Sequence, residues 1–299
     1  MVRFRRPPPP DGGPRTPGPG PTGPRSGRPT LPAPPTELVE TPHGVRLEQL
    51  VTGTGTPVTV FAHGLAGDIA GTRPLGSAVA GRRVFFQFRG HGRSDAPPGP
   101  WRFADLAEDL RAVADRAGAT RAVGVSMGAG ALARLLATDP ARFERVVLYL
   151  PAPLDGIRPR IAEERLSRLL AAVESGEAAA VADAVEGELP PSVRNTPTGW
   201  SYLRQRVDQL LRDGLAPELE TLWQEPALAD PELLKAYQGE ALVIGCHGDE
   251  VHPVSWAERL ATLLPGADLE VYDRPAVLWT HRRELRDRVS AFLNRPNGP

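Results

Sequence analysis

The chain has 299 residues, of which 40% are hydrophobic, and this is enough apolar material for one large core or two modest ones. Its 35 basic and 36 acidic residues leave a formal net charge of -1, so charge gives no reason to expect a nucleic acid or an anionic membrane as partner. A small-molecule substrate is the simpler expectation, and the single cysteine, Cys246, excludes an intramolecular disulfide.

The N-terminal sequence favours a cytoplasmic location. The opening residues, MVRFRRPPPP, lack the apolar core of a secretory signal, and no run approaches the roughly 20 apolar residues of a membrane span. Residues 1–35 are dominated by proline and glycine, a composition that buries too little apolar surface to offset the entropy of ordering. We expect this segment to be a disordered tail.

A strand, a turn and a second strand are expected to open the folded region, with the break at Pro42, His43 and Gly44. Further apolar runs predict strands at residues 58–64, 82–88, 120–125, 145–150, 241–246 and 269–273. Helical patterns separate most of them, as in residues 104–117, where apolar residues recur at steps of four, three and four. This alternation predicts an α/β fold with a mostly parallel, eight-stranded sheet covered on both faces.

One interval interrupts this alternation. Residues 152–238 contain no convincing strand but hold helical patterns such as IAEERLSRLLAAVE, at residues 161–174. The interval is too long for a simple connection between two strands. We expect a helical cap over the carboxyl edge of the sheet, where ligands bind in open α/β folds, and a core formed by residues 36–151 and 239–295.

The sequence GVSMG places Ser126 between Gly124 and Gly128, after a predicted strand and before a predicted helix. This is the strand-turn-helix setting of a G-x-S-x-G nucleophile elbow. A nucleophile on so sharp a turn takes a strained backbone conformation, and a β-carbon at either flanking position would collide with its neighbours. A glycine-rich turn with an incidental serine is the alternative interpretation.

Two later motifs favour the nucleophile. GCHGDEVHPV follows the strand at 241–246, and VLWTHRRELRDRVSAFL lies near the C-terminus, so Ser126, Asp249 and His281 occur in the order nucleophile, acid, histidine. Three more stretches agree: FAHGLAG, FRGHGRSD and LPGADLEVYD. With these motifs the sequence resembles the α/β-hydrolase superfamily, in its cap-bearing, serine-dependent branch, over residues 36–295.

The resemblance implies a role for each of these residues. Ser126 is the expected nucleophile, His281 the base and Asp249 the acid that orients it. The backbone N–H groups of Leu65 and Met127 form the expected oxyanion hole. The residues expected to support them are His63, Gly64, Gly124 and Gly128.

Several assignments have competitors. Asp155, which follows the preceding strand, is the alternative acid, and Glu250 is a weaker one. His91 is expected to shape a loop behind the site, whereas the remaining histidines have no second motif to support a role. These are His43, His247 and His252. The chain also departs from the family pattern, because Gln87 stands where relatives often carry aspartate and Thr280 where glycine often precedes the catalytic histidine.

Taken together, the motifs predict a serine hydrolase that cleaves a small-molecule ester, thioester or lactone, as a carboxylic ester hydrolase does. No metal-binding spacing and no dinucleotide fingerprint occurs, so no cofactor or metal is expected. A perhydrolase, a haloperoxidase, an acyltransferase or a cyclase on the same fold remains an alternative, because one fold supports many reactions. A hydrolase-like protein that only binds its ligand is the alternative outside the enzymes.

Overall fold

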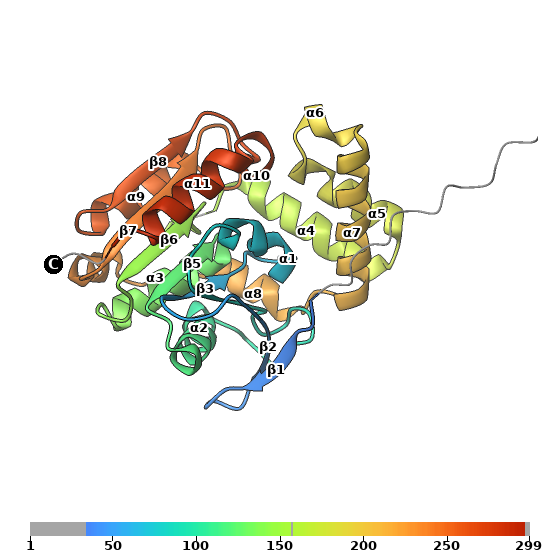
Figure 1. The fold of residues 1–299 in the computed structure, drawn as a ribbon. Coiled ribbons are helices and arrows are strands. Elements are labelled where there is room, and N and C mark those ends of the chain that lie inside the picture. The colour runs from blue at the N-terminus through green and yellow to red at the C-terminus, as the bar shows by residue number, and fades with distance from the viewer. Residues whose placement is uncertain (1–33, 157, 297–299) are drawn as a thin grey trace, which may run out of the picture. The chain divides into compact units, whose positions relative to one another are not determined.

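The computed structural model describes residues 34–156 and 158–296, so nearly all of the tail predicted at residues 1–35 lies outside the described residues. The described chain forms one eight-stranded sheet in the order β1-β2-β4-β3-β5-β6-β7-β8 (Figure 1). The first two neighbouring pairs, β1 with β2 and β2 with β4, are antiparallel, and all the others are parallel. The strands are β1 (Glu37–Glu40), β2 (Arg46–Thr52), β3 (Val58–Ala62), β4 (Arg82–Phe86), β5 (Arg121–Val125), β6 (Arg145–Tyr149), β7 (Glu240–Cys246) and β8 (Asp268–Tyr272).

Each predicted strand is present, and the predicted α/β fold with a mostly parallel sheet is confirmed. Two strands end earlier than predicted: β3 stops at Ala62 and β4 at Phe86. The residues after them, including His63 and Gly64, therefore belong to loops at the carboxyl edge of the sheet. All five residues of β3 and of β6 are buried, as expected for central strands covered on both faces.

Helices cover both faces of the sheet, since alternate strand residues enter two separate apolar clusters. Val60 packs in a cluster with residues of α2 (Phe103–Ala117), α3 (Met127–Thr138) and α9 (Val254–Leu263). Phe61, the next residue, packs in a cluster with residues of α11 (Arg282–Leu293) and of the short 3-10 helix η1 (Arg73–Gly76). The period of two along β3 thus assigns neighbouring side chains to opposite layers.

Between β6 and β7, every regular element in the described part of the chain is a helix, and none is a strand. Its elements are α4 (Arg160–Ser175), α5 (Ala178–Val185), η2 (Glu186–Glu188), α6 (Pro191–Arg194), α7 (Pro197–Asp213), α8 (Glu218–Gln224) and η3 (Pro231–Ala236). Figure 1 shows α4, α5, α6 and α7 grouped together beside the sheet. Apolar residues of α4, α5 and α7 form a small cluster that also contains Ala66, from the loop after β3.

Two short helices complete the fold: α1 (Ile69–Thr72) after β3, and α10 (Val277–Thr280) between β8 and α11. Among the helices of residues 34–156 and 158–296, none is both long and apolar enough to cross a membrane.

Two leucines on neighbouring strands test where the core lies. Leu242 on β7 is fully buried, whereas Leu269 on the edge strand β8 is 41% exposed. Leu242→Ala is expected to lower the free energy of unfolding by about 2–5 kcal/mol, because it leaves a cavity. Leu269→Ala is the matched control, with an expected loss of about 0.5 kcal/mol or less. Urea unfolding measures both, and equal losses would contradict this assignment of the core.

Candidate active site

Ser126 occupies a sharp turn between β5 and α3. Its φ of 49° and ψ of -108° lie in a region that a serine rarely adopts, so the surrounding packing must hold it there. A β-carbon on Gly124 would lie 2.6 Å from the carbonyl oxygen of Gly128, and one on Gly128 would lie 2.5 Å from that of Ala62. The glycines of the elbow therefore let α3 start directly against β3 and β5.

His252 is the histidine that contacts Ser126. The Ser126 Oγ lies 2.8 Å from His252 Nε2, and His252 Nδ1 lies 3.3 Å from Asp249 Oδ2. The other carboxylate oxygen, Oδ1, accepts hydrogen bonds from the backbone N–H groups of Val251 at 2.8 Å and His252 at 2.9 Å. One carboxylate thus orders the loop after β7 and orients the ring that faces the serine.

The surroundings of Asp249 keep its carboxyl ionised. Burial raises its pKa, but the hydrogen bond from the His252 ring, the charge of that ring and the two backbone N–H groups together outweigh burial. The pKa of Asp249 is consequently below its usual value. An ionised acid at this position can hold the Nδ1 proton of the imidazole and leave Nε2 free to accept one from serine.

The structure differs from the sequence prediction at His281. Within the described residues His281 has no hydrogen bond to Ser126 or Asp249; its Nε2 lies 2.9 Å from Asp273 Oδ1, and its Nδ1 lies 2.9 Å from Thr280 Oγ1. His281 sits where α10 ends and α11 begins, and its ring is held by the loop that follows β8. The expected grouping of Ser126, Asp249 and His281 is thus replaced by one of Ser126, Asp249 and His252.

The turn before α10 also departs from the expected glycine and histidine pair. The left-handed residue there is Ala276, with a φ of 56°, and the residue after it is the fully buried Val277. Thr280, in front of His281, is helical instead. Ala276 thus has the left-handed backbone conformation that glycine favours, but the next residue is Val277, whose apolar side chain cannot transfer a proton.

Neither alternative acid contacts a histidine in the described part of the chain. Both oxygens of Asp155 accept hydrogen bonds from Arg259, at 2.6 and 2.7 Å. Glu250 pairs with Arg165 at 2.6 Å. Among the three candidate acids, the structure places Asp249 alone against an imidazole.

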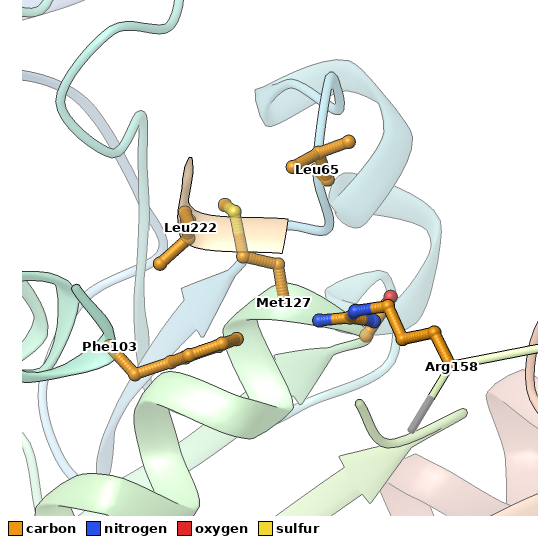
Figure 2. Close-up of a pocket in the computed structure, with 6 residues that line it drawn as sticks. Leu65, Phe103, Met127, Arg158 and Leu222 are labelled. Atoms are coloured by element: carbon orange, nitrogen blue, oxygen red, sulfur yellow. The ribbon is translucent and has the colours of Figure 1, made fainter. Parts of the chain in front are cut away.

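Leu65 and Met127, the expected oxyanion donors, line the same small cavity as Ser126 (Figure 2). Met127 is the first residue of α3, so its N–H has no acceptor within the helix and lies at the positive end of the helix dipole. The space open to a water-sized molecule is about 10 Å³, roughly that of one water. An acyl group therefore requires the side chains around the cavity to move.

Two buried histidines hold the loop that carries Leu65. His63 Nε2 accepts a hydrogen bond from the Phe88 N–H at 3.1 Å, and its Nδ1 lies 2.7 Å from the Gly64 carbonyl. His91 Nε2 accepts one from the Ala66 N–H at 3.2 Å. These partners require each ring to be neutral, with the proton on Nδ1. The structural roles expected for His63 and His91 agree with these contacts.

Burial keeps both rings neutral. It lowers the pKa of His63 from 6.5 to about 4, against the opposing effect of the Gly64 carbonyl. Burial, together with His63, lowers the pKa of His91 from 6.5 to about 3. Charged imidazolium on either residue would lose its backbone N–H donor, so the loop beside Ser126 depends on two uncharged rings.

The helical insertion holds the same loop from the other side. Arg206 on α7 donates from Nη1 to the Ala66 carbonyl at 2.5 Å, and its Nη2 pairs with Glu188 at 3.1 Å. Burial lowers the pKa of Arg206, but the charge and hydrogen bond of Glu188, together with Tyr202 and Asp68, outweigh burial and raise it. A charged, buried guanidinium therefore links α7 to the segment that contains Leu65.

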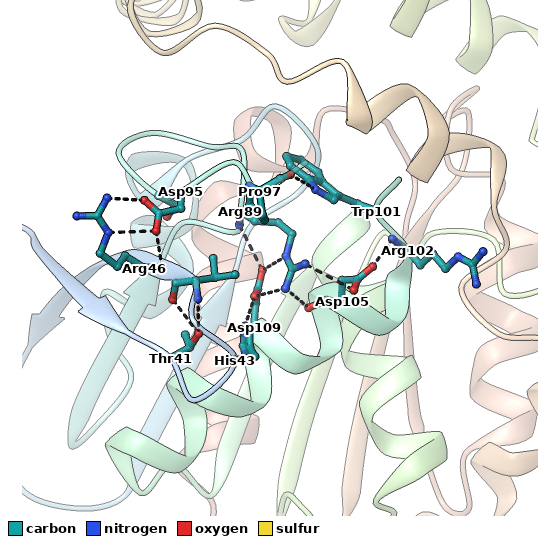
Figure 3. A network of polar contacts seen from close by, with 12 residues as sticks. Thr41, His43, Arg46, Arg89, Asp95, Pro97, Trp101, Arg102, Asp105 and Asp109 are labelled. Carbon is teal, nitrogen blue, oxygen red and sulfur yellow. Dashed lines mark hydrogen bonds and ion pairs between the residues drawn. The ribbon is translucent and has the colours of Figure 1, made fainter. Parts of the chain in front are cut away.

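The contacts of His43, Cys246 and His247 indicate structural roles for these residues. His43 Nε2 lies 2.9 Å from Asp109, a fully buried carboxylate on α2 that also pairs with Arg89 at 2.7 Å (Figure 3). Burial raises the pKa of the Cys246 thiol to about 12, which makes it a poor nucleophile. His247 contributes a backbone N–H to the Tyr272 carbonyl at 2.9 Å.

The sequence contains one signal for His252, although the motif order favours His281. Asp249 and His252 are three residues apart in a loop directly after a predicted strand, so both must lie at the carboxyl edge of a parallel sheet. That spacing lets an aspartate accept from the backbone two and three residues later and also reach the ring. A histidine after the last strand fits the order of the family motifs, whereas His252 lies in the same loop as the acid.

Comparison with known proteins identifies the fold. A family model described as alpha/beta hydrolase fold matches residues 57–273, and no curated protein sequence matches the chain. Among solved structures, the enol-lactonase of Burkholderia xenovorans LB400 is 21% identical, with a TM-score of 0.73 over 87% of this chain and 100% of that one.

Two other solved structures are similarly close. The bromoperoxidase of Bacillus anthracis is 18% identical, with a TM-score of 0.71 over 87% of this chain and 100% of that one. An esterase of Rhodococcus sp. ECU1013 is 22% identical, with a TM-score of 0.68 over 86% and 99%. At these identities the likeness establishes the fold, and the reaction must be argued from the site.

The buried histidines predict a loss of stability in mild acid. The unfolded chain binds protons on these rings as the pH falls through about 6.5, whereas the folded chain leaves them neutral until about pH 4 for His63 and about pH 3 for His91. Folding is thus opposed as the pH falls from 7 to 5, by up to roughly 1.4 kcal/mol per pH unit and proton. Urea unfolding at several pH values measures this slope. His91→Gln is expected to reduce it, and an unchanged slope would contradict the neutral, buried ring.

Proposed function

Because the chain belongs to the α/β-hydrolase fold family, we propose that it is a serine hydrolase that cleaves a small-molecule ester, thioester or lactone through an acyl-enzyme on Ser126. The observation that carries this proposal is the 2.8 Å contact between Ser126 Oγ and His252 Nε2. The other ring nitrogen of His252, Nδ1, contacts the Asp249 carboxylate at 3.3 Å. A nucleophile, a base and an acid in series are what acyl transfer to water requires.

The proposed reaction begins when Ser126 Oγ attacks the acyl carbon and gives its proton to His252 Nε2. Asp249 stabilises the imidazolium and keeps the other proton on Nδ1. The tetrahedral intermediate collapses as His252 returns the proton to the leaving alcohol or thiol, or to the ring oxygen of a lactone. Water then attacks the acyl-enzyme with His252 as base, and the carboxylic acid is released.

The negative oxygen of the intermediate needs donors that are already in place. The backbone N–H groups of Leu65 and Met127 are the proposed donors, because both residues line the cavity of Ser126. Loss of one such donor typically costs about a hundredfold to a thousandfold in rate. The contacts of His63, His91 and Arg206 with the loop of Leu65 then position one of the two donors.

A fluorophosphonate probe tests the nucleophile. Wild-type protein is expected to react covalently and to hydrolyse short p-nitrophenyl esters, and Ser126→Ala is expected to abolish both, because the probe and the ester acylate or phosphonylate the same oxygen. Mass spectrometry locates the label. If labelling does not depend on Ser126 and no ester is turned over, the hydrolase proposal fails and a binding protein remains.

A matched pair of variants tests the base. His252→Ala is expected to lower kcat/KM by about a thousandfold or more, since it removes the proton acceptor of Ser126. His281→Ala makes the same change on a ring that contacts Asp273 and is expected to retain most of the activity. Circular dichroism of both variants verifies folding. If His281→Ala is the inactive variant, the base is His281 and the assignment to His252 is wrong.

A further inference from the structure

The turn that carries Leu65 contains a strained alanine. The backbone N–H of Gly67 donates to the Gly64 carbonyl at 2.8 Å, and this bond closes a four-residue turn over residues 64–67. Within it Ala66 has a φ of 54°, a left-handed value that is unfavourable for alanine because the β-carbon crowds the backbone. Such a conformation persists only where the surrounding structure holds it.

The 64–67 turn lies directly against the nucleophile. A β-carbon on Gly64 would be 3.4 Å from the β-carbon of Ser126. Leu65, the next residue, lines the cavity of Ser126, and its N–H is one of the two proposed oxyanion donors. The position of that N–H is set by the shape of the turn. A misplacement of about 1 Å at an active site can lower a rate by about a hundredfold.

The helical insertion supplies two of the contacts that hold Ala66. This residue is 1% exposed and packs in the small apolar cluster formed with residues of α4, α5 and α7. Its carbonyl accepts a hydrogen bond from Arg206 Nη1, on α7, at 2.5 Å. From the other side, His91 accepts the hydrogen bond of its N–H. The strained residue is thus held between the loop after β4 and the insertion.

Arg206 is itself fixed by its neighbours, so it can act as a rigid anchor. Glu188 accepts from its Nε at 3.2 Å and from its Nη2 at 3.1 Å, and Gln209 Oε1 accepts from its Nη1 at 2.6 Å. The Tyr202 hydroxyl donates to the same Glu188 carboxylate. Because the Arg206 side chain is only 13% exposed, water screens these charge-assisted bonds little. Moving the guanidinium away from the Ala66 carbonyl would break several of them.

We propose that Arg206 is a positioning residue for the reaction, which makes the oxyanion hole depend on the docked insertion by binding the Ala66 carbonyl. This inference rests on the proposed function, since Leu65 acts as a donor only if Ser126 attacks an acyl group. Arg206 lies outside the cavity of Ser126, whose described lining residues are Leu65, Phe103, Ser126, Met127, Arg158 and Leu222. Its loss should therefore weaken binding of the transition state more than binding of the substrate.

Ester hydrolysis by Arg206 variants tests this role. Arg206→Met removes the donor and keeps an apolar stem, and it is expected to lower kcat by about tenfold to a hundredfold with KM changed about twofold or less. Arg206→Lys keeps a cationic donor and is expected to restore part of the loss. Arg204→Met, the matched control, removes an exposed arginine from the same helix and should keep the wild-type kcat. A wild-type kcat in Arg206→Met, or a loss that appears only in KM, would overturn the proposal.

A pair of substrates separates a misplaced donor from a partly unfolded protein. In p-nitrophenyl acetate the attacked carbonyl carries oxygen, whereas in its thiono analogue it carries sulfur, a weaker hydrogen-bond acceptor. The ratio of the two kcat/KM values, corrected for cleavage by hydroxide, is expected to favour the oxygen ester in the wild type and to fall about fivefold or more in Arg206→Met. Unfolding lowers both values equally, so an unchanged ratio would overturn the proposal.

Hydrogen exchange tests the contact without turnover. In Ser126→Ala protein, adding Arg206→Met is expected to speed exchange of the backbone N–H groups of Ala66 and Gly67, whereas those of β5 should keep their rates. Unchanged exchange in the 64–67 turn would overturn the proposal. Failure of fluorophosphonate labelling and of all ester cleavage would reject the proposed hydrolase function and this inference with it. Labelling and cleavage that Arg206→Met leaves unchanged would reject the positioning role alone.

Discussion

The turn at Ser126 is the constraint on which the rest of the site depends. β5 must end and α3 must begin around a single residue with a φ of 49°, and α3 must start against the carbonyl groups that follow β3. Gly128 permits this approach because it has no β-carbon. The same contact sets the distance between the nucleophile and the loop of Leu65, so the serine and its proposed oxyanion donors are positioned together.

The proposed acid and base share one loop, and this makes their geometry local. Asp249 fixes the loop through two backbone N–H groups and orients the His252 ring with its second oxygen. The parallel pairing of β5, β6 and β7 brings this loop to the same edge of the sheet as Ser126. The segment after β8, where His281 pairs with Asp273, is therefore not needed to complete the arrangement.

Much of the fold was predictable because its signals are short-range. Continuous apolar runs mark the buried strands, and GVSMG between a strand and a helix marks the elbow, since only glycine allows such close packing. The choice between histidines was not predictable in this way. His252 and His281 both follow strands at the same edge of the sheet, and sequence order alone favoured the later one.

The sequence by itself determined the α/β fold, the helical character of the interval between β6 and β7, and the place of Ser126, because periodicity and glycine spacing act over a few residues. The tertiary structure decided which imidazole meets the serine and which charge lies beside it. Both depend on side-chain directions at the ends of β5, β6 and β7, which are set by packing between segments far apart in the chain. That packing places His252 and Arg158 at the site and holds His281 on Asp273.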